Sequence, residues 1–385
     1  MNWMVTINKL DPDQRIVLDN LLKFESSHWI RGFAGSGKSI LLIHSLRETL
    51  ITNPQATACV IAFTHSLKDM LQSGLPENSR HIPVMTYHEF KSMPRRYDYI
   101  FVDEVQDLEP YILTLLQSSC SKLIMAGDEE QSIYEQRVSP EFIQASTSPS
   151  IHSLSIVHRL TEKLRKIVAT ILPNSKVHSA RQGKPTADVK ITLANASKHE
   201  DEMRWVWQNA QRFTRAGDPV CILLSKHRLV QDFIAFVCKE AHVANPSFIG
   251  ERGKKNDYEE CNKHLASNGV ILRYLGNGHG SLIDSDRERI VYVMTYHSSK
   301  GLDFETVFLP GLDEDVSIFN RNDEPMERRL FYVAATRSRR NLFISYTGQR
   351  PHPFVASMPQ NLLEKMPVGA ASAAGGASQN NADYY

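Results

Sequence analysis

The octapeptide Gly32-Phe-Ala-Gly-Ser-Gly-Lys-Ser39 is the sequence feature that most restricts what this chain can fold into. It fits the pattern G-x-x-x-x-G-K-[ST] in full, follows the short segment His28–Arg31, and precedes a helical stretch that begins near Ser39. A strand before the motif and a helix after it are the context that this pattern requires. Glycines let the backbone wrap closely around an anion, so that N–H groups and the positive end of the helix point at it. The motif therefore predicts a phosphate-binding loop, with a flexible glycine turn as the alternative.

The residue types of this loop indicate a nucleoside triphosphate and a metal ion. The lysine of such a loop holds the β- and γ-phosphates, and the hydroxyl group after it takes a Mg²⁺ coordination position. We therefore expect ATP and Mg²⁺ as cofactors, with Lys38 in catalysis and Ser39 as a metal ligand. The predicted contacts to the nucleotide in this loop are Gly32, Ala34, Gly35, Ser36, Gly37, Lys38 and Ser39.

An apolar segment, Tyr99–Val102, ends in two adjacent carboxylates, Asp103 and Glu104. If the segment is a strand, both acids lie at the carboxyl edge of a sheet, where doubly wound sheets bind ligands. Asp103 is suited to hold Mg²⁺ through its water shell, and Glu104 to orient and deprotonate an attacking water. The alternative is a helix N-terminus, where acidic residues are favoured by the helix dipole.

A third apolar segment, Lys122–Ala126, ends in Gly127-Asp-Glu-Glu-Gln131 and places more polar groups at the same edge. Gln131 is the candidate sensor of the γ-phosphate. In isolation this segment is equally typical of an ordinary acidic loop.

Short apolar runs alternate with helical stretches along most of the chain, which predicts an α/β fold with right-handed crossovers. The runs are rich in β-branched residues and continuous, as in strands buried on both faces of a parallel sheet. The expected strands are 58–63, 99–102, 122–126, 189–193, 220–224, 290–295, 307–309 and 341–346, and the expected helices include 39–50, 199–215, 229–239 and 327–335.

A length of 385 residues suits two domains. We expect a first domain over residues 1–147 and a second over 148–350, because Ser146–Ser153 interrupts the strand and helix pattern. Within the second, Gly250–Arg289 is rich in polar residues and is interpreted as an insertion or a small subdomain. The tail, 351–385, ends in a Gly/Ala/Ser/Asn-rich stretch that predicts disorder from Val368 onward.

Composition excludes several classes of protein. A net charge of +1 creates no global field for nucleic acid, so any such site must be a local patch. The five cysteines never form a C-x-x-C pair, which disfavours a zinc ribbon or a disulfide framework. No signal sequence and no membrane-spanning segment is recognisable. A cytoplasmic protein with no membrane partner is the expectation.

The order of these motifs resembles superfamily 1 helicases of the UvrD/Rep/PcrA type over about residues 8–348. The resemblance extends to the Q motif at Leu10–Gln14, strand-binding motifs Ia and Ic, and motifs IV, V and VI; these last five are at 63–65, 85–88, 157–159, 295–304 and 327–337. It implies two RecA-like domains, each a mostly parallel sheet flanked by helices, with ATP in the cleft between them.

Residue by residue, the resemblance implies that Gln14 reads the adenine edge and that His158 stands at the adenine-stacking position. Arg159 and Arg337 would reach the γ-phosphate from the second domain as catalytic cations, although either arginine alone would suit a surface salt bridge. Asp303, after Gly301, would approach the ribose. The implied nucleic-acid contacts are Phe63, Thr64, His65, Thr86, His88, Tyr134, Thr295 and His297.

The chain also departs from the family. Glu135-Gln-Arg137 replaces the usual Gly-Trp-Arg of motif III, so an aromatic that could stack on a base is absent. Only Glu89–Asp98 separates motif Ic from the acidic pair, which leaves no room for the accessory subdomain of the first domain. These features suggest a minimal form, of the size of the helicase-like GajB subunits in Gabija antiphage systems.

We therefore expect an ATP-dependent motor on single-stranded DNA, with RNA as the other candidate strand and 3′-to-5′ polarity by family analogy. An ATP-gated regulatory subunit of a partner nuclease, acting in antiviral defence, is the alternative. A small-molecule kinase is disfavoured because it leaves motifs IV to VI unexplained.

Overall fold

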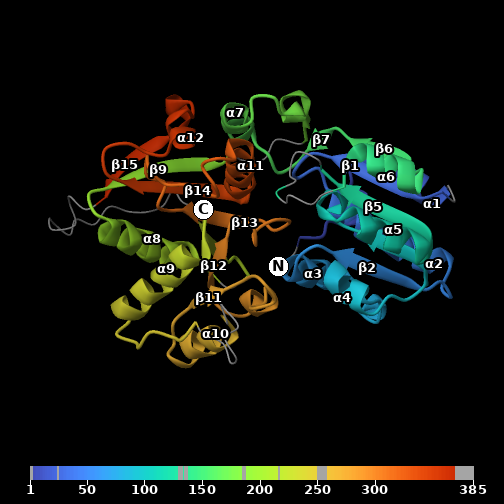
Figure 1. Ribbon diagram of the computed structural model, residues 1–385, viewed down its shortest axis with the longest axis horizontal. Helices are drawn as coiled ribbons and strands as arrows, with labels where there is room; N and C mark the ends of the chain where they lie inside the picture. Colours follow the sequence, from blue (N-terminus) through green and yellow to red (C-terminus); the bar gives the residue numbers. More distant parts are fainter. Residues whose placement is uncertain are drawn as a thin grey trace.

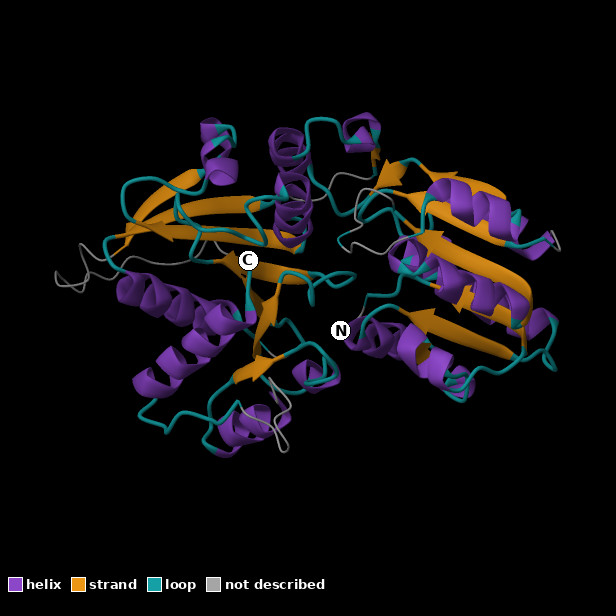
Figure 2. Cartoon of the chain, in the orientation of Figure 1, coloured by secondary structure: helices purple, strands orange, loops and turns teal. Residues whose placement is uncertain are grey.

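The computed structural model describes residues 3–23, 26–128, 133, 138–183, 188–215, 217–248 and 258–368. In this part of the chain, helices flank two parallel sheets that stand side by side (Figures 1 and 2). The α/β class and the parallel sheets are as the sequence predicts. We refer to the two sheet units as the first and second domains.

The first sheet has the strand order β3-β2-β4-β5-β1-β6, and each neighbouring pair is parallel. Strand β2, next to the edge strand β3, is fully buried because its apolar run Ala58–Ala62 is covered on both faces. The strands are β1 (His28–Gly32), β2 (Ala58–Ala62), β3 (Val84–Thr86), β4 (Tyr97–Val102), β5 (Cys120–Gly127) and β6 (Ser150–Leu154). The helices of this part are α1 (Pro12–Lys23), α2 (Lys38–Thr52), α3 (His65–Gly74), α4 (Tyr87–Ser92), α5 (Pro110–Ser118) and α6 (Pro140–Thr147).

The second sheet has the order β11-β12-β10-β13-β14-β9-β15 and is also parallel throughout. Its strands are β9 (Lys190–Ala196), β10 (Val220–Leu224), β11 (Leu272–Tyr274), β12 (Val291–Thr295), β13 (Phe304–Leu309), β14 (Ser338–Thr347) and β15 (Glu364–Val368). The accompanying helices are α7 (Glu162–Ile171), α8 (His199–Phe213), α9 (His227–Glu240), α10 (Tyr258–Ser267), α11 (Glu324–Ala335) and α12 (Pro353–Ala356).

The structure differs from the sequence expectations at three places. β6 lies in the stretch that we expected to separate the domains, and it pairs with β1 from Ser150 to Leu154, so the first sheet continues beyond residue 147. Part of the expected insertion is integral to the second domain, because β11 pairs with β12. In the tail, β15 adds an edge strand to β9. The disorder expected from Val368 falls almost entirely on 369–385, outside the described residues.

The chain crosses between the domains through β7 (Ile156–Val157) and β8 (Arg181–Gln182), which form a small sheet of their own. We propose the domain boundary at this crossing. After β7 the chain enters α7, which packs on α11 of the second domain (Figure 1). One apolar core cluster contains buried residues of both domains, among them Leu67 of α3 and Leu302.

A side chain at Gly301 would lie 3.0 Å from the Leu67 side chain, which shows how tightly the domains approach there. None of the described helices has the length and apolarity that crossing a membrane requires.

Candidate active site

The predicted phosphate loop connects the end of β1 at Gly32 to the start of α2 at Lys38. Gly35 and Gly37 have φ angles of 72° and 90°, in the left-handed region that favours glycine. A Cβ atom at Gly35 would collide with Arg159, and one at Gly37 with the amide of Gln14. The glycines therefore bring the loop into direct contact with two other residues of the predicted site.

Lys38 and Ser39, the predicted phosphate and metal contacts, are held by hydrogen bonds at the start of α2. The Lys38 ammonium donates to the carbonyl oxygens of Gly32 (2.9 Å) and Phe33 (3.1 Å). The Ser39 hydroxyl donates to Asp103 Oδ2 at 2.6 Å. A hydroxyl and a carboxylate in contact are hard oxygen ligands, and Mg²⁺ in such sites takes one or two protein oxygens and completes its shell with phosphates and water. Both residues thus fit the predicted metal site.

Glu104 stands directly after the strand β4 with a left-handed backbone, φ 55° and ψ 45°. This conformation costs a non-glycine residue roughly 1–3 kcal/mol, and such strain tends to accumulate at functional sites. The carboxylate accepts a hydrogen bond from the Gln106 amide, whose own oxygen accepts from the Asp128 N–H at 3.0 Å. The backbone of the third predicted segment is thus linked to the candidate base.

The two adjacent acids titrate in opposite directions. Burial, followed by the neighbouring Glu104 charge, raises the pKa of Asp103 to about 6. Burial opposes ionisation of Glu104 as well, but the cations Lys300 and Lys38 outweigh it and lower the pKa of that carboxyl. Glu104 is therefore ionised at neutral pH, as a general base must be, and a cation bound at Asp103 would relieve the repulsion between the pair.

Lys300 enters this cluster from the second domain. Its ammonium lies 2.5 Å from Asp107 Oδ2 and 4.0 Å from Glu104 Oε2, and its side chain is only 1% exposed. Lys300 lies within motif V and Asp107 three residues after Glu104, and the sequence alone assigns neither a role. The structure shows that the Lys300 ammonium and the Asp107 carboxylate form a buried ion pair.

A cavity of about 560 Å³ lies between the domains and contains both walls of the predicted nucleotide site. The first domain contributes the phosphate loop and Glu104, and the second contributes Gly301, Asp303 and Arg337, with Arg159 on the crossing segment. The predicted site residues that line the cavity are Gln14, Gly35, Gly37, Lys38, Ser39, Glu104, His158, Arg159, Gly301, Asp303 and Arg337. Ala34 and Ser36, also predicted, are buried within the loop itself.

The two arginines are held differently. The Arg159 guanidinium lies 3.7 Å from Asp303 Oδ2, and its Nε is buried without a hydrogen-bond partner among the described residues. Arg337 is 1% exposed and donates to the carbonyls of Leu302 (2.8 Å) and Val333 (2.7 Å). Burial, and then the charge of Arg159, lower the pKa of Arg337 to about 9, so it remains a cation at neutral pH.

Asp303, which we expected to approach the ribose, lines the cavity and forms ion pairs. Besides Arg159 it binds Arg339, whose Nε lies 2.5 Å from Asp303 Oδ2. These cations, acting against burial, lower the pKa of Asp303. In this structure Asp303 Oδ2 therefore positions both arginines at the cavity.

At the other end of the cavity, Gln14 and His158 share one partner that the sequence analysis did not single out. His158 Nε2 lies 2.6 Å from Asp11 Oδ2, and Gln14 Oε1 accepts from the Asp11 N–H at 3.0 Å. The Gln14 amide also donates to the carbonyl of Ser36 at 2.9 Å. These contacts connect the two predicted adenine contacts to the phosphate loop.

Among the predicted nucleic-acid residues, the threonines serve as helix caps or bond locally, and the rings lie half-buried or exposed. Thr86 is buried and caps α4, with Glu89 completing a capping box. Thr64 is half-buried and caps α3 by accepting a hydrogen bond from the Leu67 N–H. Thr295 is buried and bonds to Ser298 at 2.9 Å. Their contacts are structural in this state. Phe63 instead stacks on Tyr87 with ring centroids 5.0 Å apart, while His65 and His88 are exposed.

In the second domain, His297 packs near Phe319, with a centroid separation of 5.8 Å. Burial, assisted by His227 and Lys300, lowers the pKa of His297 to about 4, so its ring is neutral at physiological pH. Phe319 was not among the predicted contacts; its exposure, 36%, is the signal that marks it. Gln131 and Tyr134 lie outside the described residues.

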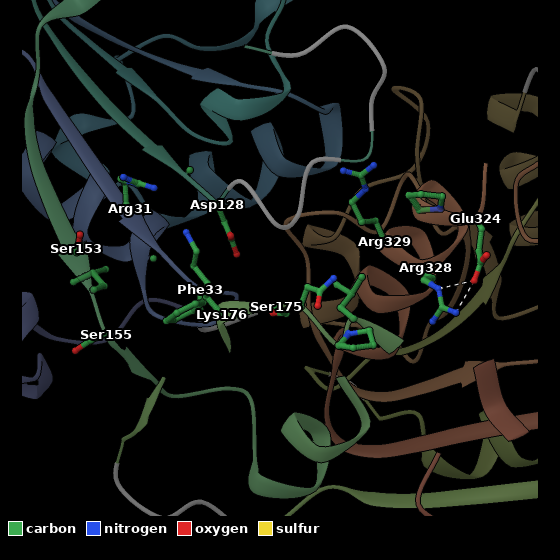
Figure 3. A pocket seen from close by; sticks show the side chains of 17 residues that line it. Arg31, Phe33, Asp128, Ser153, Ser155, Ser175, Lys176, Glu324, Arg328 and Arg329 are labelled. Carbon is green, nitrogen blue, oxygen red and sulfur yellow. Dashed lines mark hydrogen bonds and ion pairs between the residues drawn. The ribbon is translucent and has the colours of Figure 1, made fainter. Parts of the chain in front are cut away.

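A second interdomain cavity, of about 1,090 Å³, opens beside the base of the phosphate loop. Figure 3 shows Arg31, Phe33 and Asp128 on one side and Arg328 and Arg329 on the other. Arg328 is held by Glu324 at 2.5 Å. Of the predicted nucleotide contacts, Gly32 alone is among the described residues that line this cavity.

A phosphate loop facing arginines across two parallel-sheet domains defines a P-loop NTPase with a composite site. Comparison with known families narrows the class. Residues 28–210 match the model of the viral superfamily 1 RNA helicase core domain, and residues 255–349 match the UvrD-like helicase C-terminal domain. Each domain of the chain is thus similar to a superfamily 1 helicase domain, and the second is similar to the C-terminal domain of UvrD-like helicases.

Individual relatives match over short segments. The ATP-dependent DNA helicase Rep of Buchnera aphidicola subsp. Schizaphis graminum is 43% identical over 89 residues, 19% of this chain and 13% of that protein. The ATP-dependent DNA helicase PcrA of Staphylococcus aureus (strain Mu50) is 35% identical over 103 residues, 22% of this chain and 14% of that protein. The chain thus spans only a small part of these relatives' length. A solved structure, the PRRSV helicase, is similar over 86% of this chain and 54% of its own, with 16% identity and a TM-score of 0.43.

Proposed function

We propose that this protein is an ATP-hydrolysing motor that moves on single-stranded nucleic acid, with DNA as the primary strand and 3′-to-5′ polarity. The observation that carries the proposal is that Lys38 and Glu104 of one domain line a single cavity with Arg159 and Arg337. Hydrolysis in such a site depends on how closely the two walls approach. The Rep and PcrA relatives are ATP-dependent DNA helicases, which supports the choice of DNA.

The residues divide the work as phosphoryl transfer requires. Lys38 and the loop amides bind the phosphates, and Ser39 with Asp103 would hold Mg²⁺, which when bound offsets phosphate charge. Glu104 is ionised and accepts the proton of the attacking water. Arg159 and Arg337 offset the charge that develops on the transferred phosphoryl group; arginines supplied in this way contribute about 10³–10⁵ in rate.

Motion follows from the same arrangement. Arg159 forms only a loose ion pair with Asp303, and its Nε has no hydrogen-bond partner among the described residues. A bound triphosphate would therefore attract its guanidinium more strongly than Asp303 does. Binding therefore closes the cleft, and loss of the γ-phosphate removes the attraction. A strand held by both domains is shifted by one such cycle.

The test is ATP hydrolysis measured with single-stranded, duplex and tailed DNA and with the same series in RNA, with Lys38→Ala as the inactive control. We expect single-stranded DNA to accelerate hydrolysis several-fold more than duplex does, and end-labelled strands to report movement toward the 5′ end. Rates that are indifferent to every strand would contradict a motor.

A second function, an ATP-gated subunit that regulates a partner nuclease, is favoured by one observation. α4 ends at Ser92 and β4 begins at Tyr97, so the accessory subdomain of the first domain is replaced by a short connection. A motor without this subdomain has less surface for a duplex. Co-purification followed by nuclease assays with and without ATP distinguishes this role, since only a regulator changes the nuclease rate of its partner.

A further inference from the structure

A β-hairpin of the second domain projects to the first domain next to motif Ia. It follows β11 and has Asn277 and Gly278 at its tip, flanked by Gly276 and His279, which exchange backbone hydrogen bonds of 3.0 and 2.9 Å. Asn277 and Gly278 have φ angles of 50° and 83°. Positive φ at both central residues is the signature of a type I′ turn, for which Asn-Gly is the preferred sequence.

The base of the hairpin is fixed to motif V. Gly276 packs so closely on the segment after β12 that a Cβ there would lie 2.6 Å from Ser298 Oγ. The Asn277 amide lies 3.2 Å from His227 Nε2, and His227 Nδ1 lies 3.1 Å from the Tyr258 hydroxyl. Tyr258 in turn stacks on Tyr274 of β11 with a centroid distance of 3.6 Å. These contacts make the tip a rigid projection of the second domain.

The tip meets the first domain at His65. A Cβ on Gly278 would lie 3.4 Å from the His65 ring, which is van der Waals contact, so the tip and the imidazole adjoin one another (Figure 1 shows the segment after β11 beside α3). His65, Asn277 and Gly278 are all exposed. The contact therefore leaves an imidazole face and a carboxamide accessible on adjoining domains.

Aromatic rings lie along the chain on both sides of this contact. On the first domain, Phe63, two residues before His65, stacks on Tyr87. On the second domain, His297 directly precedes the Ser298 that supports the hairpin, and packs near Phe319. Rings of this kind are where single-stranded bases stack, and amides contact base edges or phosphates.

We propose that the Asn277–Gly278 hairpin tip and His65 together form a single-strand contact that spans both domains. This inference rests on the proposed function. In this role the hairpin tip holds one nucleotide of the strand at the place where the two domains move relative to each other. It also gives this chain a strand contact that is built without the tryptophan absent from motif III.

The experiment uses two matched pairs of variants, because the chain has a second Asn-Gly pair, Asn268–Gly269, in an exposed turn of the same domain. Asn277→Asp keeps a side chain that suits the type I′ turn but adds a negative charge at the tip. Asn268→Asp adds the same charge at the other turn. Affinity for fluorescent oligo-dT is measured with the full chain at low and at moderate salt.

We expect Asn277→Asp to weaken oligo-dT binding about tenfold at low salt, because a carboxylate there repels the phosphates. The difference should shrink at higher salt as screening grows. Asn268→Asp should bind as the wild type does. Equal affinities for the two variants would overturn the proposal, since a charge at a strand contact cannot be without effect.

The second pair tests the shape of the tip. Gly278→Val places a β-branched residue at positive φ and disrupts the turn, whereas Gly269→Val imposes the same strain at φ 70°, where nothing lies within 4 Å. We expect only Gly278→Val to lose stimulation of ATP hydrolysis by oligo-dT. Equal stimulation in both variants, with thermal unfolding midpoints matched, would overturn the inference while leaving the motor intact. Absence of strand binding in the wild type would instead refute the proposed function itself.

Discussion

The ammonium of Lys300 lies 2.5 Å from the carboxylate of Asp107, and the two residues come from different domains. Both side chains are almost completely buried, with exposures of 1% and 0%. Lys300 stands next to Gly301, which lines the nucleotide cavity, and Asp107 stands three residues beyond the candidate base Glu104. The pair therefore connects the approach of the domains to the position of the candidate catalytic acids.

Lys300→Met should destabilise the protein by about 3–5 kcal/mol, because it leaves Asp107 buried without its cation. Chemical denaturation measures this. The double variant Lys300→Met with Asp107→Asn should recover much of the loss, since it removes the unpaired charge. Single and double variants with the same free energy of unfolding would show that the pair is not coupled.

The local parts of the site were predictable from contiguous patterns, and the arginines of the opposite wall only from the family resemblance, whereas individual interdomain contacts were not predictable. The phosphate loop and the strand that ends at Asp103 are contiguous patterns, so their geometry follows from a few neighbouring residues. Lys300 and Asp107 lie far apart in the chain, and the sequence around each residue does not indicate that the other is its partner. The Asn277–Gly278 turn has a recognisable sequence, but its contact with His65 depends on the placement of a whole domain.

The edge strands show the same limit within the fold. β6 alternates between half-exposed and exposed positions before Leu154, because an edge strand with a free face needs no continuous apolar run. Its serines therefore resemble a linker. β15 is exposed at Glu364, Lys365, Met366 and Pro367, and its proline is tolerated because edge strands do not need every N–H.

Glu104→Gln should bind ATP with near-normal affinity and hydrolyse it about 10²–10⁴ times more slowly, because the amide keeps the shape of the base and removes its basicity. Fluorescent nucleotide titration gives the affinity and phosphate release gives the rate. Normal turnover in this variant would show that another group accepts the proton.

The affinity for Mg²⁺ in the nucleotide complex should fall as the pH is lowered through about 6, because Asp103 must lose its proton to accept the ion. The free energy of unfolding depends on pH in the opposite direction. Because the pKa of Asp103 is raised, the folded protein binds more protons than the unfolded chain between about pH 4 and 6. The contribution of Asp103 to stability therefore decreases as the pH rises through that range. Half-saturating Mg²⁺ concentrations for hydrolysis at pH 5.5 and 7.5 test the first statement. Asp103→Asn should abolish the pH dependence that belongs to this carboxyl.

The composite site itself is tested most directly by Arg159→Ala, because Arg159 makes only one loose ion pair and has an unpartnered Nε among the described residues. Arg165→Ala, which removes a guanidinium bonded to Ala180 and Gln182 away from the cavity, is the matched control. The rate of ATP hydrolysis at saturating ATP and oligo-dT is the measurement. We predict a loss of about 10³-fold or more for Arg159→Ala, with ATP affinity within a few-fold of normal and the control unaffected. A hydrolysis rate in Arg159→Ala equal to that of Arg165→Ala would contradict a site shared between the two domains.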